Sequence, residues 1–218
     1  MAIQEIEQSV RDFATASENA ISAGFDGVEC HGANGYLIDQ FIQDTSNQRN
    51  EIMKAMANAV GPERVGIRLS PWSPFQGMRM ANPIPQFMDI IHKASQLNLA
   101  YLHLVESRVS GAEDYGGSNE RLDFAYRLWN GPILVAGGYK PADAQRLVDE
   151  ENPDKEIVVM FGRYFIANPD LVYRIMEGVA LNAYDRKTFY ISNSSVGYVD
   201  YPLSMEYLKS KKITISSS

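Results

Sequence analysis

Short apolar runs alternate with longer amphipathic stretches along most of this chain. The apolar runs are rich in β-branched residues, which is typical of strands buried in a parallel sheet, and they span residues 27–30, 65–69, 100–105, 132–136 and 157–161. Between them, apolar side chains recur at helical spacing, which predicts helices over residues 3–23, 51–60, 85–97, 120–129, 141–149 and 169–177. This alternation predicts an α/β protein built from βα units.

Two architectures fit such an alternation, a doubly wound sheet and a (β/α)₈ barrel. Polar residues or glycines follow each expected strand, as they do on the catalytic face of a barrel. The segment after the first strand lacks the glycine fingerprint that a dinucleotide-binding doubly wound fold needs there. Since only five strands are expected, we predict an incomplete barrel. No linker or shift in composition divides the chain, so residues 1–218 are expected to form a single partial barrel domain.

Composition excludes several classes of partner. The net charge is −7 and no basic stripe offsets it, which argues against nucleic acid or an anionic membrane as a partner. No apolar run approaches the roughly 20 residues that span a bilayer, and there is no signal-peptide pattern. The single cysteine, Cys30, fits a reducing compartment, so a cytoplasmic location is expected. His92, His103 and Cys30 lack the spacing of metal ligands, and no metal site is expected.

Three polar side chains, His31, Asn34 and Tyr36, lie close together at the end of the first expected strand. Two hydrogen-bond donors and a phenol suit a site that holds a carbonyl oxygen and delivers a proton beside it. From the residues alone, His31 could instead be a strand-end imidazole satisfied by the backbone. Tyr36 could equally be an aromatic ring packed over the sheet.

One later strand carries a charged residue, and glycines that could bind a ligand follow the last two expected strands. Arg68 lies in an apolar strand, where an unpaired charge is costly; its alternative role is an ion pair with Glu29 or Glu106. Glycines that follow a strand and precede a helix let backbone N–H groups approach a phosphate, and an adjacent arginine adds a bidentate donor. Such residues occur twice, as Gly137-Gly138 and as Gly162-Arg163.

Six motifs, in the same order along the chain, resemble those of the old yellow enzyme family, most closely its fungal members. They are HGANGYLIDQF from His31, VGIRLSP from Val65, AYLHLVE from Ala100, VAGG from Val135, FGRYFIANPDL from Phe161 and GYVDYP from Gly197. The resemblance extends from about residue 3 to residue 207. It implies an FMN-containing (β/α)₈ barrel that takes hydride from NAD(P)H and reduces activated C=C bonds.

Mapped onto that barrel, this chain resembles strands four to eight with their helices, and the first three βα units are absent. A second difference follows Arg49, where the family usually continues into a TDEYGGS stretch that is missing here. The similar string at residues 115–118 comes after a later strand and is not that motif.

The resemblance also implies roles for individual residues. His31 and Asn34 are expected to bind the substrate's carbonyl oxygen, and Tyr36 is expected to donate the proton. The expected FMN contacts are Arg68 at the pyrimidine edge of the flavin and Gly137, Gly138, Gly162 and Arg163 at the phosphate. Tyr198 is expected to line the substrate pocket, and the alternative is an aromatic ring buried in a surface loop.

Two hypotheses of different classes follow. The first is an FMN-dependent, NAD(P)H-using ene-reductase that acts on small α,β-unsaturated carbonyl compounds. The second is a truncated, catalytically inactive barrel remnant, or a half that needs a partner chain. The second rests on the two open edges of a five-stranded sheet, which are also expected to favour self-association.

Overall fold

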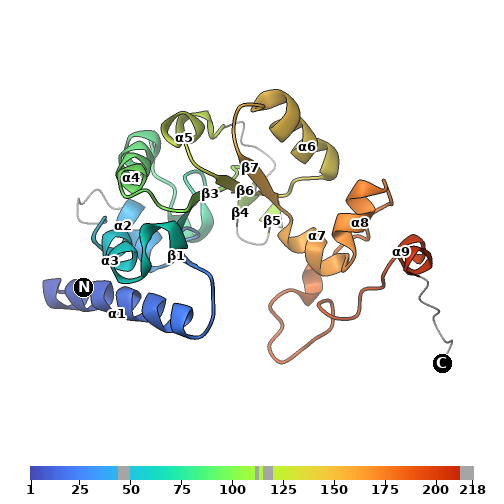
Figure 1. Cartoon of the computed structure of the whole chain (residues 1–218), viewed down its shortest axis with the longest axis horizontal. Coiled ribbons are helices and arrows are strands. Elements are labelled where there is room, and N and C mark those ends of the chain that lie inside the picture. The colour runs from blue at the N-terminus through green and yellow to red at the C-terminus, as the bar shows by residue number, and fades with distance from the viewer. Residues whose placement is uncertain (44–49, 111–112, 115–119, 212–218) are drawn as a thin grey trace. The chain divides into compact units, whose positions relative to one another are not determined.

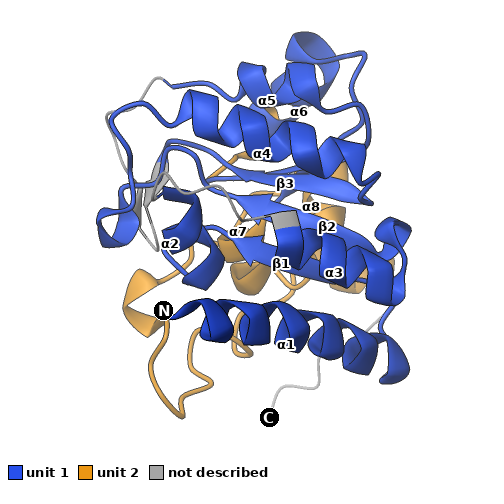
Figure 2. Ribbon diagram, turned by 90° about the vertical axis from the view of Figure 1, so that its left-hand side faces the viewer, with its two compact units in different colours: residues 1–137, 143–160 blue, residues 138–142, 161–218 orange. Residues whose placement is uncertain are grey.

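The computed structural model describes residues 1–43, 50–110, 113–114 and 120–211. The chain divides into two compact units, which are coloured separately in Figure 2. Unit 1 comprises residues 1–137 and 143–160, and unit 2 comprises residues 138–142 and 161–218. The string at 115–118 and the sequence difference after Arg49 lie outside the described residues.

Unit 1 is built on one parallel sheet (Figure 1). Its strands lie side by side in chain order: β1 (Val28–Gly32), β2 (Val65–Leu69), β3 (Tyr101–Val105), β6 (Ile133–Ala136) and β7 (Ile157–Met160). Each expected strand is therefore present. Within the described residues, β1 and β7 are the open edges of this sheet.

The helices of unit 1 cover one face of the sheet, because right-handed crossovers between successive parallel strands all pass on the same side. Helix α3 packs on β2 and on α1, and α4 packs on α5 (Figures 1 and 2). Their bounds are α1 (Ile3–Ser22), α2 (Leu37–Gln43), α3 (Asn50–Val60), η1 (Pro62–Arg64), η2 (Phe75–Gly77), α4 (Ile84–Gln96) and α5 (Asp123–Leu128). A short antiparallel pair, β4 (Val109–Ser110) and β5 (Glu113–Asp114), follows β3.

The two faces of the sheet differ sharply in chemistry. Cys30, Ile67, Leu102 and Ile133 lie beside one another on the helix-covered face and are buried. On the opposite face the strand register places one row of side chains across all five strands, each directly opposite the next. This row is His31, Arg68, His103, Leu134 and Val158. The row is thus polar on β1 to β3 and apolar on β6 and β7.

Unit 2 consists of short helices joined by extended segments. Helix α6 (Pro141–Gln145) begins in it and continues as a π-helical turn, η3 (Arg146–Glu151), in unit 1. The other elements are α7 (Gly162–Ala167), α8 (Leu171–Met176), η4 (Arg186–Thr188) and α9 (Met205–Ser210). The buried Asp170 carboxylate links two of them, because it accepts hydrogen bonds from Arg174 Nε at 2.8 Å and from Ser204 N at 2.9 Å.

Several expected helices differ from the observed ones. The helix expected over 120–129 is confined to Asp123–Leu128, and the one expected over 169–177 begins only at Leu171. Pro169 therefore does not open the helix. The Asp170 side chain is engaged by Ser204 and Arg174, from later in the chain, rather than by the first turn of α8.

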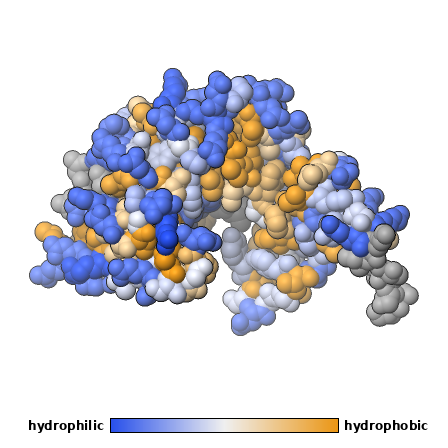
Figure 3. Space-filling model, viewed as in Figure 1, coloured by the Kyte–Doolittle hydropathy of each residue, from blue (hydrophilic) through white to orange (hydrophobic). Residues whose placement is uncertain are grey.

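Apolar side chains remain exposed on both units (Figure 3). In unit 1 they include Val158 and Met160 on the edge strand β7, and in unit 2 they include Tyr190 and Val199. Among the described residues, no helix combines the length and the apolar character needed to cross a membrane.

Candidate functional site

The imidazole of His31 lies on β1 with one ring nitrogen engaged by the backbone. The N–H of Ala33 donates to His31 Nδ1 at 3.3 Å, so in the neutral ring the proton resides on Nε2. Burial of the ring and the positive charge of Arg68 both lower the pKa of His31 below its ordinary value, although Glu29 opposes them. The geometry therefore favours a neutral His31 with Nε2–H as a hydrogen-bond donor.

The segment after β1 is a tight turn that returns the chain beside His31. Asn34 has a φ of 56° and Gly35 a φ of 72°, both in the left-handed region. The turn brings the ring of Tyr36 to 5.0 Å from the His31 ring, between centroids. Tyr36 is 58% exposed, so its hydroxyl is accessible. His31, Asn34 and Tyr36 are thus brought together, as expected.

Arg68 lies directly opposite His31 in the register of β1 and β2. Its Nη1 donates to His103 Nε2 at 2.5 Å, and His103 Nδ1 donates to Glu29 Oε2 at 2.8 Å. The neighbouring strands β1, β2 and β3 each contribute one member of this chain of contacts. The ion pair considered for Arg68 from the sequence is therefore made to Glu29 indirectly, with His103 between them.

Charge and burial act together in this cluster. Burial alone would raise the pKa of Glu29, but the hydrogen bond from His103 and the positive charge of Arg68 are among the causes that outweigh it and hold that pKa below its usual value. Burial and the Glu29 carboxylate raise the pKa of Tyr101 to about 12. Burial lowers the pKa of Arg68, and the negative charge of Glu29 opposes this. Arg68 thus stays a cation on the face of the sheet opposite the helices.

The residues expected to bind the phosphate are divided between the two units, and each unit is taken by itself. Gly137 belongs to unit 1, has a φ of 142°, and has no room for a side chain because a Cβ there would lie 2.5 Å from Glu106 Cβ. Gly138, Gly162 and Arg163 belong to unit 2. A Cβ on Gly162 would meet nothing within 4 Å, so the packing of the chain does not require a glycine there. Such a glycine fits a backbone that a ligand approaches closely.

Arg163 is the second residue of helix α7 and lies beside an aromatic cluster of unit 2. Its guanidinium lies 5.1 Å from the centre of the Tyr184 ring, and that of Arg186 lies 5.5 Å from the same ring. Tyr198 lies in the same unit, and its hydroxyl accepts a hydrogen bond from Tyr190 N at 3.2 Å. Tyr198 is therefore tied to its own loop, and 38% of its surface stays exposed.

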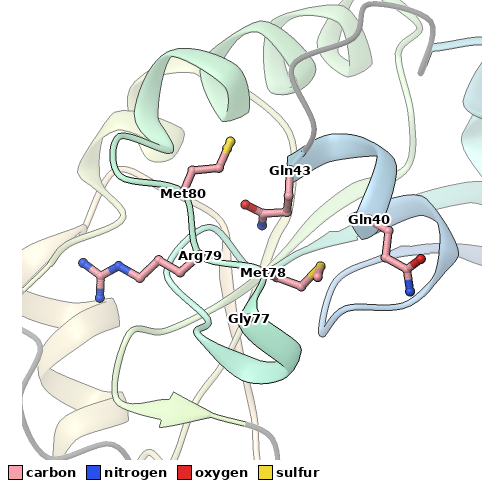
Figure 4. Close-up of a pocket in the computed structure, with 6 residues that line it drawn as sticks. All are labelled: Gln40, Gln43, Gly77, Met78, Arg79 and Met80. Atoms are coloured by element: carbon pink, nitrogen blue, oxygen red, sulfur yellow. The ribbon is translucent and has the colours of Figure 1, made fainter.

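A pocket of about 380 Å³ lies in unit 1 beyond the 33–36 turn (Figure 4). Gln40 and Gln43 of α2 face the segment 77–80 across it. The amide of Gln40 donates to Gly35 O at 2.7 Å and so joins the pocket wall to the turn. Arg79, on the other wall, forms an ion pair with Glu120.

Four residues that contact the expected site were not assigned to it from the sequence, although Glu29 was considered as an ion-pair partner of Arg68. They are Asp39 and Ser70, which bind the 33–36 turn, and His103 and Glu29, which bind Arg68 directly or through each other. A signal for Asp39 existed, because it is a single acidic residue between the apolar Ile38 and Phe41. The partners of Ser70 and His103 come from distant parts of the chain and have no local signature.

Comparison with known proteins identifies the family. Residues 1–182 match the NADH:flavin oxidoreductase / NADH oxidase family. The chain is 46% identical over 222 residues to a chanoclavine-I aldehyde reductase of Penicillium roqueforti, covering 94% of this chain and 60% of that protein. It is 45% identical over 228 residues to a probable inactive dehydrogenase of Claviceps purpurea, with the same coverage.

A solved structure agrees with the sequence matches. An Old Yellow Enzyme from Pichia sp. superposes with a TM-score of 0.80 at 34% identity, covering 94% of this chain and 57% of that one. The expected incomplete barrel is thereby confirmed, and FMN and NAD(P)H are the cofactors of the family. The chain spans about 60% of the length of the curated relatives it matches. It belongs to the NADH:flavin oxidoreductase / NADH oxidase family, as a relative of the old yellow enzymes.

Proposed function

We propose that this chain carries the substrate-binding and flavin-contacting residues of an FMN-dependent ene-reductase that acts on small α,β-unsaturated carbonyl compounds. One observation carries the proposal: a neutral His31 with Nε2–H as donor lies 5.0 Å from Tyr36 and directly opposite Arg68. The aldehyde reductases among the relatives support a conjugated aldehyde as the substrate class.

The carbonyl oxygen of the substrate would bind between His31 and Asn34. As hydride adds to the β-carbon, negative charge develops on that oxygen, and fixed N–H donors stabilise it in the transition state. The fixed tautomer of His31 matters here, because Nε2–H can donate without first losing or gaining a proton. Tyr36 would then transfer its phenolic proton to the α-carbon, which completes reduction of the C=C bond.

Each unit, taken by itself, carries residues whose chemistry suits FMN. FMN, when bound, would accept hydride from NAD(P)H and pass it to the substrate. Arg68 would contact the pyrimidine edge, where a cation stabilises negative charge. Gly137, Gly138 and Gly162 would present backbone N–H groups to the phosphate, and Arg163 would add a guanidinium.

Replacement of Tyr36 tests the catalytic assignment. In the FMN-loaded chain, Tyr36→Phe should slow reduction of a cyclic enone by about 10²–10⁴-fold, the usual contribution of a general acid. Reduction of the flavin by NADPH should keep its wild-type rate, because the phenol takes no part in that step. A matched control is Tyr173→Phe, on α8. An equal loss of both half-reactions in Tyr36→Phe would contradict the assignment.

A second candidate function is a partial barrel that acts only with another chain. The observation that favours it is the pair of open parallel edges, β1 and β7, in a chain that spans about 60% of the length of its relatives. Open edges present unpaired backbone groups, so self-association is part of this proposal. Light scattering tests it, because a monomer at micromolar concentration that also binds FMN would contradict it.

We also propose a cytoplasmic location. Its support is the single cysteine, Cys30, which is buried and free of any disulfide. Imaging of the chain fused to a fluorescent protein tests it, and secretion into the medium would contradict it.

A further inference from the structure

We propose that Ser70 and Asp39 are positioning residues, whose side chains fix the turn that carries Asn34 and Tyr36 and set its distance from Arg68. The geometry stands without any assumption about activity. Only its catalytic consequence rests on the function proposed above.

Four successive backbone N–H groups of the turn each have a partner. Those of Ala33 and Tyr36 donate to His31 Nδ1 and to Ala33 O, both at 3.3 Å. The N–H of Asn34 donates to Ser70 Oγ at 2.9 Å, and that of Gly35 donates to Asp39 Oδ2 at 2.8 Å. The two shorter bonds, at the centre of the turn, are therefore the ones that the side chains of Ser70 and Asp39 accept.

Both acceptors lie out of reach of solvent. Ser70 is 1% exposed and Asp39 is 0% exposed. The Ser70 hydroxyl also interacts with the Asp39 carboxylate, whose Oδ1 accepts a hydrogen bond from Gln43 Nε2 at 3.2 Å. Because water cannot replace either side chain there, loss of one leaves a buried donor unsatisfied. Ser70 and Asp39 thus act as one connected unit beneath the turn.

The turn has a conformation that needs such support. Asn34 has a Cβ and a φ of 56°, in the left-handed region that residues other than glycine adopt less readily, although asparagine enters it more often than most. At Gly35, a Cβ would lie 2.9 Å from Gln76 Oε1, so this position also has no room for a side chain. Hydrogen bonds from Asn34 and Gly35 to buried acceptors supply the support.

Ser70 also connects the turn to the neighbouring strand. It follows the end of β2 at Leu69 and lies two residues after Arg68. One hydroxyl therefore joins the proposed carbonyl-binding residues to the strand that carries the proposed flavin contact. Since catalysis depends strongly on the alignment of reacting groups, a shift of this turn is expected to slow hydride transfer to substrate.

The test compares Ser70→Ala with Ser73→Ala by amide hydrogen exchange in the full chain. Ser73 is a matched control, because it is 3% exposed in the same segment and its hydroxyl accepts from Phe75 N instead of from the turn. In Ser70→Ala we expect the amide of Asn34 to exchange at least tenfold faster, with the amide of Leu102 in β3 unchanged. Ser73→Ala should alter neither amide.

The same variants are then measured with FMN and an enone. Ser70→Ala should lower kcat for enone reduction at least tenfold and leave flavin reduction by NADPH unchanged, whereas general loss of structure would lower both. Unchanged exchange at Asn34 would overturn the proposal, and so would a wild-type kcat in a chain that turns over. Failure of the wild-type chain to bind FMN would overturn the proposed function alone, because the exchange experiment needs no flavin.

Asp39→Asn keeps the proposal testable if Ser70→Ala does not fold. It preserves the size of the side chain but gives up one acceptor oxygen, so the amide of Gly35 should exchange faster while the amide of Leu102 does not. Protection of Gly35 equal to wild type would overturn the role of Asp39.

Discussion

The protonation of His31 is the property of a single residue on which the proposed chemistry depends most. Its Nδ1 accepts the Ala33 N–H, and the ring lies near the positive charge of Arg68. A cationic ring would carry a proton on Nδ1 as well, and the bond from Ala33 would be lost. The tautomer and the charge of His31 are thus set by two neighbours.

Titration of His31 by NMR measures this effect. We expect a midpoint below the ordinary value of 6.5, because burial and Arg68 both disfavour the charged ring. In Arg68→Met the midpoint should rise, since one of the two causes is removed. Arg127→Met, at an exposed position on α5, should leave it unchanged. A wild-type midpoint above 6.5 would contradict the assignment.

At this scale, sequence motifs located the residues that we propose contact a ligand but not the ones that hold them in place. His31, Asn34, Tyr36 and Arg68 stand in recognisable local patterns, and the structure brings them together. Ser70 accepts a bond from a residue 36 positions away. Such a contact depends on how β1 and β2 pair, and no local spacing encodes it.

Among the elements, strands β1, β2 and β3 are joined by hydrogen bonds between the side chains of Glu29, Arg68 and His103, on the face of the sheet opposite the helices. A cation in a sheet is costly unless it is paired. The pairing also explains why an apolar strand such as β2 tolerates Arg68.

The stability conferred by this cluster should depend on pH. The pKa of Glu29 is lowered in the folded state, so its contribution is present above its unfolded value of 4.5 and is lost as pH falls through the folded value. In urea unfolding, the difference between wild type and Glu29→Gln should be largest above pH 4.5 and shrink below it. For Glu18→Gln, at an exposed site on α1, we expect no such trend. A difference that grows on acidification would contradict the prediction.

In unit 2, helix α8 depends on a buried ion pair. Arg174 Nε donates to Asp170 Oδ1 at 2.8 Å, and its Nη1 donates to Ala180 O at 2.6 Å. Arg174→Met should lower the free energy of unfolding by about 3–5 kcal/mol, because it leaves the Asp170 carboxylate buried without its cation. Circular dichroism in urea measures this change. The exposed Arg146→Met should change it by no more than about 0.5 kcal/mol, and an equal effect of the two variants would contradict the account.

Helix length explains which elements could be predicted from sequence. The longer helices α1, α3 and α4 were expected close to their observed bounds, because they repeat an apolar face over several turns. Helices α2, α7 and α9 contain six or seven residues each and were not expected. Helices α5 and α8, of six residues each, were expected, but over longer ranges than those observed. The positions of these short helices depend on contacts such as the bond from Tyr207 N to Ser204 Oγ at the start of α9.

For the whole molecule, the parallel order of the strands followed from the alternation of strand and helix, and the family comparison confirms an incomplete barrel. The expectation of a single domain over residues 1–218 stays a prediction. The face of the sheet opposite the helices carries polar side chains on β1 to β3 and apolar ones on β6 and β7. A flat ring system with one polar edge, such as the isoalloxazine of FMN, suits a face of this kind.

Titration of FMN with the purified chain tests the central claim most directly. We expect saturable quenching of FMN fluorescence, with tighter binding of FMN than of riboflavin, since Gly162 and Arg163 would contact the phosphate. Arg163→Met should reduce the affinity for FMN to that for riboflavin, whereas Arg146→Met should not. Absence of saturable binding, or equal affinity of the wild-type chain for FMN and riboflavin, would contradict the claim that this chain carries a flavin site.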